Sequence, residues 1–409
     1  MLTLPDHAIN TAQRRLTGIR HTCQHATRRG SILVLSAVLL VVAMAFAAFT
    51  IDLGFLTLTL AEMQNASDAA SLAAAAELGQ GTGPAPQLTA SAVKSTSSSA
   101  AYTVADANPS GDLASTYVDV ARDVRFGQYQ WDSESQSWTE VWDAEPYTLV
   151  EVEVHRDRGT ALADDSETPD GPVPLFFAPV IGHQDAPLKA VSAAAIFPGV
   201  GFRITEDSSA CAPILPIALD EQSWNDLLDG IGSDDYGYNE ELDKVESSPD
   251  GVLEVNLYPS GSSSMPPGNR GTVDIGSPNN STSDLKRQIR NGISADDLSW
   301  FNGEIRFDGT PLQLNGDTGL SAGIEAALKD IVGQARAIPL FTSVSGPGNN
   351  ATYVIDRFVG IRILDVNIKG NPNKRRVVIQ PAPFMDSTVV RGETTIETDS
   401  IFTTPVLTR

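Results

Sequence analysis

Residues 31–78 read SILVLSAVLLVVAMAFAAFTIDLGFLTLTLAEMQNASDAASLAAAAEL. The first 21 of them are apolar or small and uncharged, and as a helix they would rise about 31 Å, the hydrocarbon thickness of a bilayer. A backbone that crosses lipid must satisfy its own hydrogen bonds, so this run predicts one transmembrane helix. The alanine-rich continuation has high helix propensity and ends before the glycine cluster at 79–83. We therefore expect one long helix to couple a membrane anchor directly to the unit that follows it.

Two residues near the middle of this helix, Asp52 and Gly54, depart from its apolar pattern. Gly54 is its weak point, because glycine in a helix interior is about 1 kcal/mol less favourable than alanine, and it could permit a bend. Asp52 ends the uncharged run and has two interpretations. The favoured one is a solvated carboxylate at the far headgroups, and the other is a partnered acid within a helix–helix contact.

The charges that flank the apolar run predict its orientation. Five arginines and a single acidic residue, Asp6, precede it, while the other 50 of the 51 acidic residues follow it. By the positive-inside rule, segment 1–30 is cytoplasmic and the acidic bulk lies on the far side of the membrane. A cleaved signal peptide, cut near 43–45 or 45–47, is the alternative, although its apolar region would be shorter than this one. The paired arginines at 28–29 make a twin-arginine signal a weaker alternative.

Composition narrows the class of protein. The net charge of −23 leaves no basic patch for phosphate contacts, so nucleic acid is not an expected partner. Glycine and proline are abundant, which indicates a loop-rich globular body rather than a disordered one. Cys23 and Cys211 would lie on opposite sides of the membrane and cannot pair, and we expect Cys211 to be a small buried residue.

Local patterns predict an α+β fold. A transmembrane helix continues into the alanine-rich helix, which packs on a small antiparallel sheet, and a second α+β domain follows. Boundaries fall at 1–30 (cytoplasmic basic segment), 31–53 (transmembrane helix), 54–200 (first extracytoplasmic domain) and 201–409 (second domain). Periodicity and turn residues predict helices at 88–107, 221–228, 283–290 and 320–336. They predict strands at 124–131, 137–141, 148–155, 188–197, 339–344, 353–368 and 376–380, and an apolar segment at 173–181.

Three amino-terminal motifs carry a family resemblance: RGSILVL at 29–35, FTIDLG at 49–54 and QNASDAASLA at 64–73. Their order and spacing resemble TadG-like proteins of the TadE/TadG tight-adherence, or Flp-type, pilus-assembly family. Later motifs with the same likeness are FGQY at 126–129, FFAPVIG at 176–182, AVSA at 190–193, PGNRG at 267–271 and GDTG at 316–319. The resemblance implies a single-pass inner-membrane protein that helps to assemble or anchor thin surface pili, without a catalytic role. Pseudopilin relatives carry Glu at the fifth position after a glycine, as part of the signal for prepilin peptidase. Here the fifth residue after Gly30 is Leu35, so processing by that peptidase is not implied.

No motif indicates an enzyme. There is no P-loop, no Gly-x-Ser-x-Gly and no His-Glu-x-x-His, and His155 and His183 stand far apart without a nearby cysteine. A group of acidic residues could offer oxygens to calcium, but it lacks the EF-hand spacing, and a solvated loop is the favoured interpretation. Its members are Asp229, Asp234, Asp235, Glu240 and Glu241. We therefore predict no catalytic, cofactor-binding or metal-binding residues and no cofactor.

The predicted function is non-enzymatic assembly or anchoring of Flp/Tad-type pili through protein–protein contacts. The expected partners are the membrane and other pilus-assembly or envelope proteins. The alanine ridges of the long helix also leave room for a lateral helix–helix oligomer. A membrane-anchored enzyme or a calcium-dependent adhesive module is the alternative.

Overall fold

The computed structural model describes residues 31–158, 168–206, 208–240, 242–257, 270–276, 281–307, 309–317, 319–346, 350–371, 374–392 and 399–409. The basic segment 1–30, Glu241 of the acidic group and residues 267–269 of the PGNRG motif lie outside this set.

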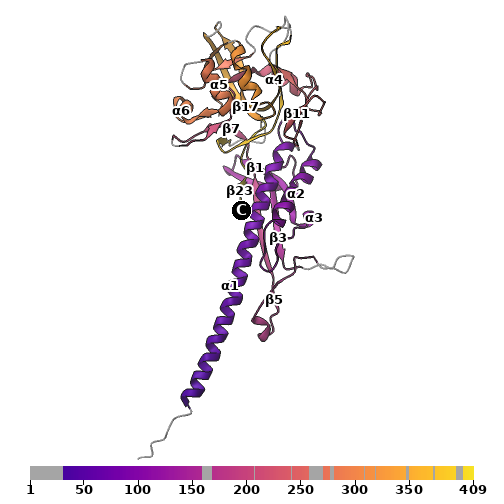
Figure 1. Ribbon diagram of the computed structural model, residues 1–409, viewed down its shortest axis with the longest axis vertical. Coiled ribbons are helices and arrows are strands. Elements are labelled where there is room, and N and C mark those ends of the chain that lie inside the picture. The colour runs from indigo at the N-terminus through magenta and orange to yellow at the C-terminus, as the bar shows by residue number, and fades with distance from the viewer. Residues whose placement is uncertain are drawn as a thin grey trace, which may run out of the picture.

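One helix dominates the molecule. Helix α1, Ser31–Glu77, has 47 residues; its first part projects from the body as a stalk and its last part lies inside the body (Figure 1). It continues into a 3₁₀ turn, η1 (Leu78–Gly81), which ends the helix at the predicted glycine cluster. The chain stays helical through Gly54, and no atom lies within 4 Å of the position that a Cβ would take there. The predicted long helix is confirmed, and it is not interrupted at Gly54.

The buried part of α1 packs on the first sheet. This sheet has the strand order β2-β1-β3-β6-β23 and is antiparallel throughout. Helix α2, Ala90–Asp106, runs beside α1 and begins at the N-cap Thr89. The strands are β1 (Val124–Asp132), β2 (Ser137–Trp142), β3 (Leu149–Arg156), β6 (Leu188–Ala195) and β23 (Val406–Leu407). The predicted hairpin at 124–141 and the helix-on-sheet packing are confirmed.

The second region is built around a closed ring of strands. Strands β9, β13, β16, β18 and β17 pair in that order, and β17 pairs with both β18 and β9, which closes the ring. Their bounds are β9 (Ile217–Asp220), β13 (Arg270–Val273), β16 (Leu312–Asp317), β17 (Ala335–Ser345) and β18 (Ala351–Asn367). Strands β19 (Arg376–Pro381) and β12 (Val255–Asn256) extend the sheet beyond β18. Closure leaves no exposed edge on the ring itself. A large apolar core that includes residues of β9, β17 and β18 packs against it.

Short helices cover this core. They are α4 (Glu221–Leu228), α5 (Thr282–Asn291) and α7 (Glu325–Lys329), and they bury Trp224, Ile289 and Leu328 respectively. The remaining elements are α3 (Val120–Asp123), β4 (Val173–Pro174), η2 (Ala178–Ile181), β5 (Asp185–Ala186), β7 (Gly199–Arg203), β8 (Cys211–Ala212), β10 (Gly237–Asn239), β11 (Lys244–Glu246), β14 (Ile293–Ser294), α6 (Ala295–Leu298), η3 (Ser299–Phe301), β15 (Glu304–Arg306), η4 (Ala322–Ile324), β20 (Phe384–Asp386), β21 (Val389–Arg391) and β22 (Ile401–Thr403).

The structure corrects two expectations in this region. The helix predicted at 320–336 is wrong in length, because η4 and α7 end at Lys329 and the chain is already in strand β17 at Ala335. Gly333, with φ of +87°, turns the chain between them. The apolar stripe behind the prediction therefore belongs to the short helical segment and the turn that follows it; its members are Ile324, Leu328, Ile331 and Val332. Cys211 is half-buried in β8 rather than fully buried.

Residues 406–409 return to the first sheet. Strand β23 pairs with β6, and the backbone carbonyl of Arg409 accepts a hydrogen bond from the Ala193 amide at 3.2 Å. The Arg409 guanidinium also forms an ion pair with Glu151 of β3. The last residues therefore tie the second region to the first, and the division at residue 200 remains our proposal.

Candidate functional site

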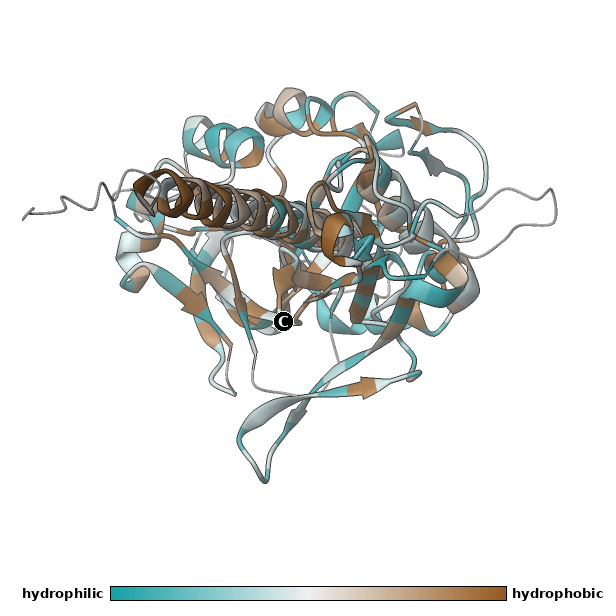
Figure 2. Ribbon diagram, turned by 90° about the horizontal axis from the view of Figure 1, so that it is seen from below, coloured by the Kyte–Doolittle hydropathy of each residue, from teal (hydrophilic) through white to brown (hydrophobic). Residues whose placement is uncertain are grey.

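Helix α1 has two halves with opposite surroundings. Its large apolar side chains from Ile32 to Leu53 are 44–74% exposed, whereas Met63, Ala70 and Ala74 are completely buried. A contiguous apolar surface of this length is far larger than a soluble monomer exposes. Viewed along its length, the projecting half is hydrophobic around its whole circumference (Figure 2). Within the described residues, one helix is long and apolar enough to cross a membrane, and it is this one.

Small side chains let the buried half approach the first sheet closely. The Ser67 hydroxyl donates to the Val152 carbonyl of β3 at 2.8 Å, and the Ser71 hydroxyl donates to Ser192 of β6 at 3.2 Å. Ala70 lies between the two serines along the helix and Ala74 follows Ser71 by three residues, and both belong to the same apolar cluster as Val152. Polar groups buried in this contact are therefore paired, and the helix is fixed by packing and by hydrogen bonds. The motif at 64–73 thus forms the joint between the stalk and the body.

Asp52 is a structural clamp rather than a solvated carboxylate. Its side chain is 5% exposed, and its two oxygens accept hydrogen bonds from three successive backbone amides. The amide of Phe176 lies at 2.8 Å, that of Phe177 at 3.2 and 3.1 Å from the two oxygens, and that of Ala178 at 2.7 Å. The favoured sequence interpretation of Asp52 is therefore wrong. The acid is partnered, but by a turn of its own chain and not by another helix.

The turn that Asp52 holds forms the end of the β4–β5 hairpin. This segment, residues 175–182 (LFFAPVIG), is called the apolar tip below, and it contains the turn η2. The hairpin extends down alongside α1, away from the strand ring (Figure 1). The Phe55 ring of α1 meets the Phe176 ring edge-on, with 5.1 Å between centroids. The tip and the segment of α1 that follows its exposed apolar run, at Asp52 and Phe55, therefore form one unit.

Charged side chains lie on the face of the first sheet opposite α1, and they pair with one another. Arg122 bonds to Asp123 at 2.6 Å and to Asp170 at 2.7 Å, and the Asp123 hydrogen bond raises the pKa of Arg122 above its ordinary value. His155 is 1% exposed, with one ring nitrogen 3.0 Å from Glu153 and the other 3.0 Å from Asp157. Both ring nitrogens are engaged, so this histidine has no free nitrogen for a substrate or a metal.

The pKa of Glu153 reflects these contacts. Burial pushes it upward, but hydrogen bonds from Lys189 and His155 outweigh burial and lower it below the ordinary value. Lys189 lies 2.8 Å from Glu153. A carboxylate that stays charged next to a histidine and a lysine serves to hold them in place.

The acidic group suggested as a calcium site is used partly for backbone contacts. The Asp234 carboxylate accepts hydrogen bonds from the backbone amides of Asp250 at 3.0 Å and of Gly251 at 3.1 Å. Among the residues that the structure describes, no three His, Cys, Asp or Glu side chains gather in a way that could hold a metal ion.

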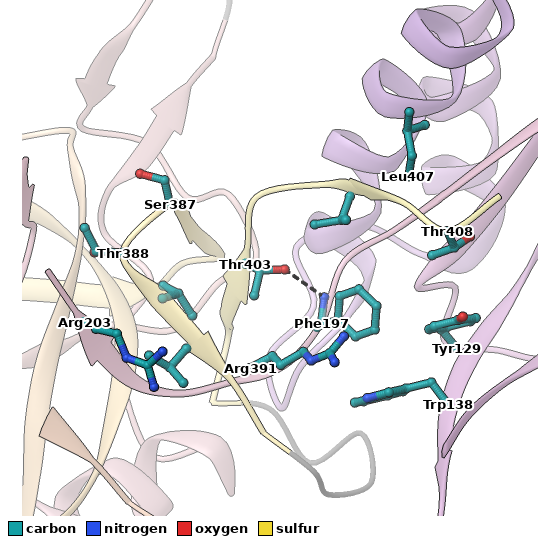
Figure 3. A pocket seen from close by; sticks show the side chains of 13 residues that line it. Tyr129, Trp138, Phe197, Arg203, Ser387, Thr388, Arg391, Thr403, Leu407 and Thr408 are labelled. Atoms are coloured by element: carbon teal, nitrogen blue, oxygen red, sulfur yellow. Dashed lines mark hydrogen bonds between the residues drawn. The ribbon is translucent and has the colours of Figure 1, made fainter. Parts of the chain in front are cut away.

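An aromatic cleft lies where the first sheet meets strands β7 and β21 (Figure 3). Its volume is about 660 Å³. Tyr129 and Trp138 stack with their planes 4° apart, and Trp138 meets Phe197 edge-on at 4.9 Å. The Arg391 guanidinium lies 5.2 Å from the Phe197 ring centre. Sequence reasoning missed this cleft because its walls come from four distant segments, and only FGQY at 126–129 gave a local signal.

The comparisons with known proteins bear on α1. Residues 30–77 match the Tad family model, described as putative Flp pilus-assembly TadE/G-like. No curated protein and no solved structure matches this chain. The matched residues coincide with helix α1 plus the single residue before it. The resemblance drawn from the sequence is thus confirmed over these residues: the helix that forms the stalk and its joint with the body is similar to the TadE/G-like Flp pilus-assembly model.

Proposed function

We propose that this chain is a single-pass protein of the inner, cytoplasmic membrane that acts without catalysis in assembling or anchoring Flp/Tad-type pili. The match of α1 to the TadE/G-like model and the membrane-directed stalk support this proposal. Segment 1–30, with five arginines, is cytoplasmic in this arrangement, and the acidic body is extracytoplasmic. The partners are the membrane and other pilus-assembly or envelope proteins.

The observation that carries the proposal is the continuity of α1. The same helix is lipid-directed over its first part and contributes Met63, Ala70 and Ala74 to the core that it forms with the first sheet, with no linker between the two parts. A membrane-tethered enzyme needs only a flexible linker, whereas a direct helical joint holds the body at a fixed height and angle above the membrane. A fixed geometry is what a scaffold for a membrane-based assembly requires.

The aromatic cleft supports contact with other proteins. Tyrosine, tryptophan and arginine are the residues enriched at the energetic centres of protein interfaces, and Tyr129, Trp138 and Arg391 line this cleft. Small residues along the lipid-directed half of α1, such as Ala43, Ala47 and Ala48, are compatible with a lateral helix–helix oligomer.

The test interrupts the joint while keeping both parts. A gene-deletion strain is complemented with the full chain carrying a six-residue Gly/Ser insertion between Ile51 and Asp52. We expect it to reach the membrane fraction at the normal level and to resist carbonate extraction, but to give few or no surface pili. The matched control is Gly54→Ala, which strengthens the helix at a position where nothing lies within 4 Å, and it should restore normal piliation.

Two results would contradict the proposal. Normal piliation by the flexible insertion would show that a rigid joint is not needed. Normal piliation in the deletion strain itself, or full complementation by a secreted body lacking residues 31–53, would remove the anchoring role altogether.

A further inference from the structure

The apolar tip is exposed to an unusual degree for a soluble surface. Val180 is 88% exposed, Ile181 75%, Phe176 64% and Phe177 44%. No residue between 175 and 182 carries a charge. Four large apolar side chains on a single turn indicate a surface that is covered by something apolar.

The position of the tip identifies what covers it. Asp52 holds its backbone, and an apolar cavity of about 440 Å³ lies between the tip and α1, lined by Met44, Ala45, Ala48 and Phe49 on the α1 side. These residues precede Asp52 by up to eight positions, which corresponds to about 12 Å along the helix. If α1 spans a bilayer over 31–51, the tip lies at the depth of the outer-leaflet acyl chains.

The backbone of the tip is suited to that depth. Lipid offers no hydrogen bonds, so non-helical backbone must be satisfied by the protein itself. The amides of Phe176, Phe177 and Ala178 bond to Asp52, and those of Val180 and Gly182 bond to carbonyls within the turn at 3.1 Å. Asp52 itself is compensated by three donors, which lowers the penalty for a carboxylate near the apolar boundary.

We infer that the apolar tip inserts into the extracytoplasmic leaflet, so that the chain meets the bilayer at two points, α1 and the tip. The exposed polar residues His183, Gln184 and Asp185 follow immediately and would lie among the headgroups. A single tilted helix leaves the body free to turn about the helix axis, so that different faces can approach the membrane, whereas a second insertion beside it fixes which face does so. The tip thus sets which face of the body points along the membrane. This inference depends on α1 spanning the membrane, but not on the pilus role.

The test uses the purified full chain in phosphatidylethanolamine/phosphatidylglycerol vesicles at low protein density, without any partner. Cys23 and Cys211 are replaced by serine, and an environment-sensitive fluorophore is attached at Val180→Cys. Leu40→Cys on the lipid-directed part of α1 is the positive control. Ser99→Cys, on the exposed surface of α2, is the aqueous control.

The expected result is a blue-shifted emission at position 180, with at least twofold quenching by lipids spin-labelled at shallow and deep positions of the acyl chain, as at position 40 but not at 99. In the Asp52→Ala variant the quenching at 180 should fall towards that at 99. Two outcomes would overturn the inference while α1 still spans: quenching at 180 as weak as at 99, or protection from water without lipid quenching, which would indicate a second copy as the cover. Absence of quenching at position 40 would instead refute the spanning helix on which both proposals depend.

Discussion

Replacing Asp52 by alanine should release the apolar tip without unfolding the body. The carboxylate accepts from three backbone amides at 2.7–3.2 Å and is 5% exposed. A hydrogen bond to a charged group contributes about 1.5–3 kcal/mol, so the lower figure for three donors gives about 4.5 kcal/mol for holding the tip. Since about 1.4 kcal/mol corresponds to a factor of ten, the opening equilibrium of the tip should rise by up to about a thousandfold.

Hydrogen exchange measures this opening directly. In the full chain in detergent micelles, the peptide that contains the amides of Phe176, Phe177 and Ala178 should exchange hundreds of times faster in Asp52→Ala. Peptides from β3 and β6 should be unchanged, because local opening does not require global unfolding. The matched control is Asp68→Ala on the same helix, whose carboxylate accepts from the Gln64 side chain at 2.7 Å and not from the tip. Exchange of the tip within about threefold of the original protein in Asp52→Ala would refute the clamp.

Three further predictions concern the stability of the body, measured by urea unfolding of the full chain in micelles. Ala70→Leu should lower the free energy of unfolding by about 1–3 kcal/mol, because Ala70 is fully buried between helix and sheet, whereas Ala76→Leu on the exposed side should change it little; equal effects would contradict this packing. Arg156→Ala should lower it by about 3 kcal/mol, because this buried guanidinium donates to two backbone carbonyls and one carboxylate, and a loss below about 1 kcal/mol would show that these bonds contribute little. Burial, with a smaller effect of the Asp284 carboxylate, raises the pKa of Asp274 to about 6, so the native state binds this proton more tightly and stability from this group declines as the pH rises from about 4 to 7. Asp274→Asn should therefore be more stable than the original protein by about 1–2 kcal/mol at pH 7 and not at pH 4; a gain that is the same at both pH values would contradict the assignment.

Much of the architecture follows from local sequence. The apolar run and its alanine-rich continuation determine α1, because lipid and helix propensity favour the same structure over 31–77. Alternating residues predicted β1, β2 and β3, and turn residues placed their ends. The helix at 320–336 was over-predicted because an apolar stripe does not reveal that Gly333 turns the chain into β17.

The functional features required information that no local window contains. The donors that clamp Asp52 lie 124–126 residues further along the chain, so its burial could not be read from its neighbours. The motif FFAPVIG at 176–182 was recognised as a family resemblance. Its place beside α1 depends on how the β4–β5 hairpin extends along that helix (Figure 1), which the local sequence does not show. Strand β23 and the aromatic cleft likewise result from the chain returning to its first sheet after more than two hundred residues.

If one uninterrupted helix joins the membrane to the body, a spin-label distance measured along α1 in lipid reports its continuity. Labels at Leu40→Cys and Leu60→Cys, both exposed positions of α1, bracket Asp52 and Gly54 in a chain whose own cysteines are replaced. Twenty residues of continuous helix predict a single narrow distance of about 30 Å between the two backbone positions. A broad distribution, or a maximum well below that distance, would show a hinge between anchor and body and would contradict the account.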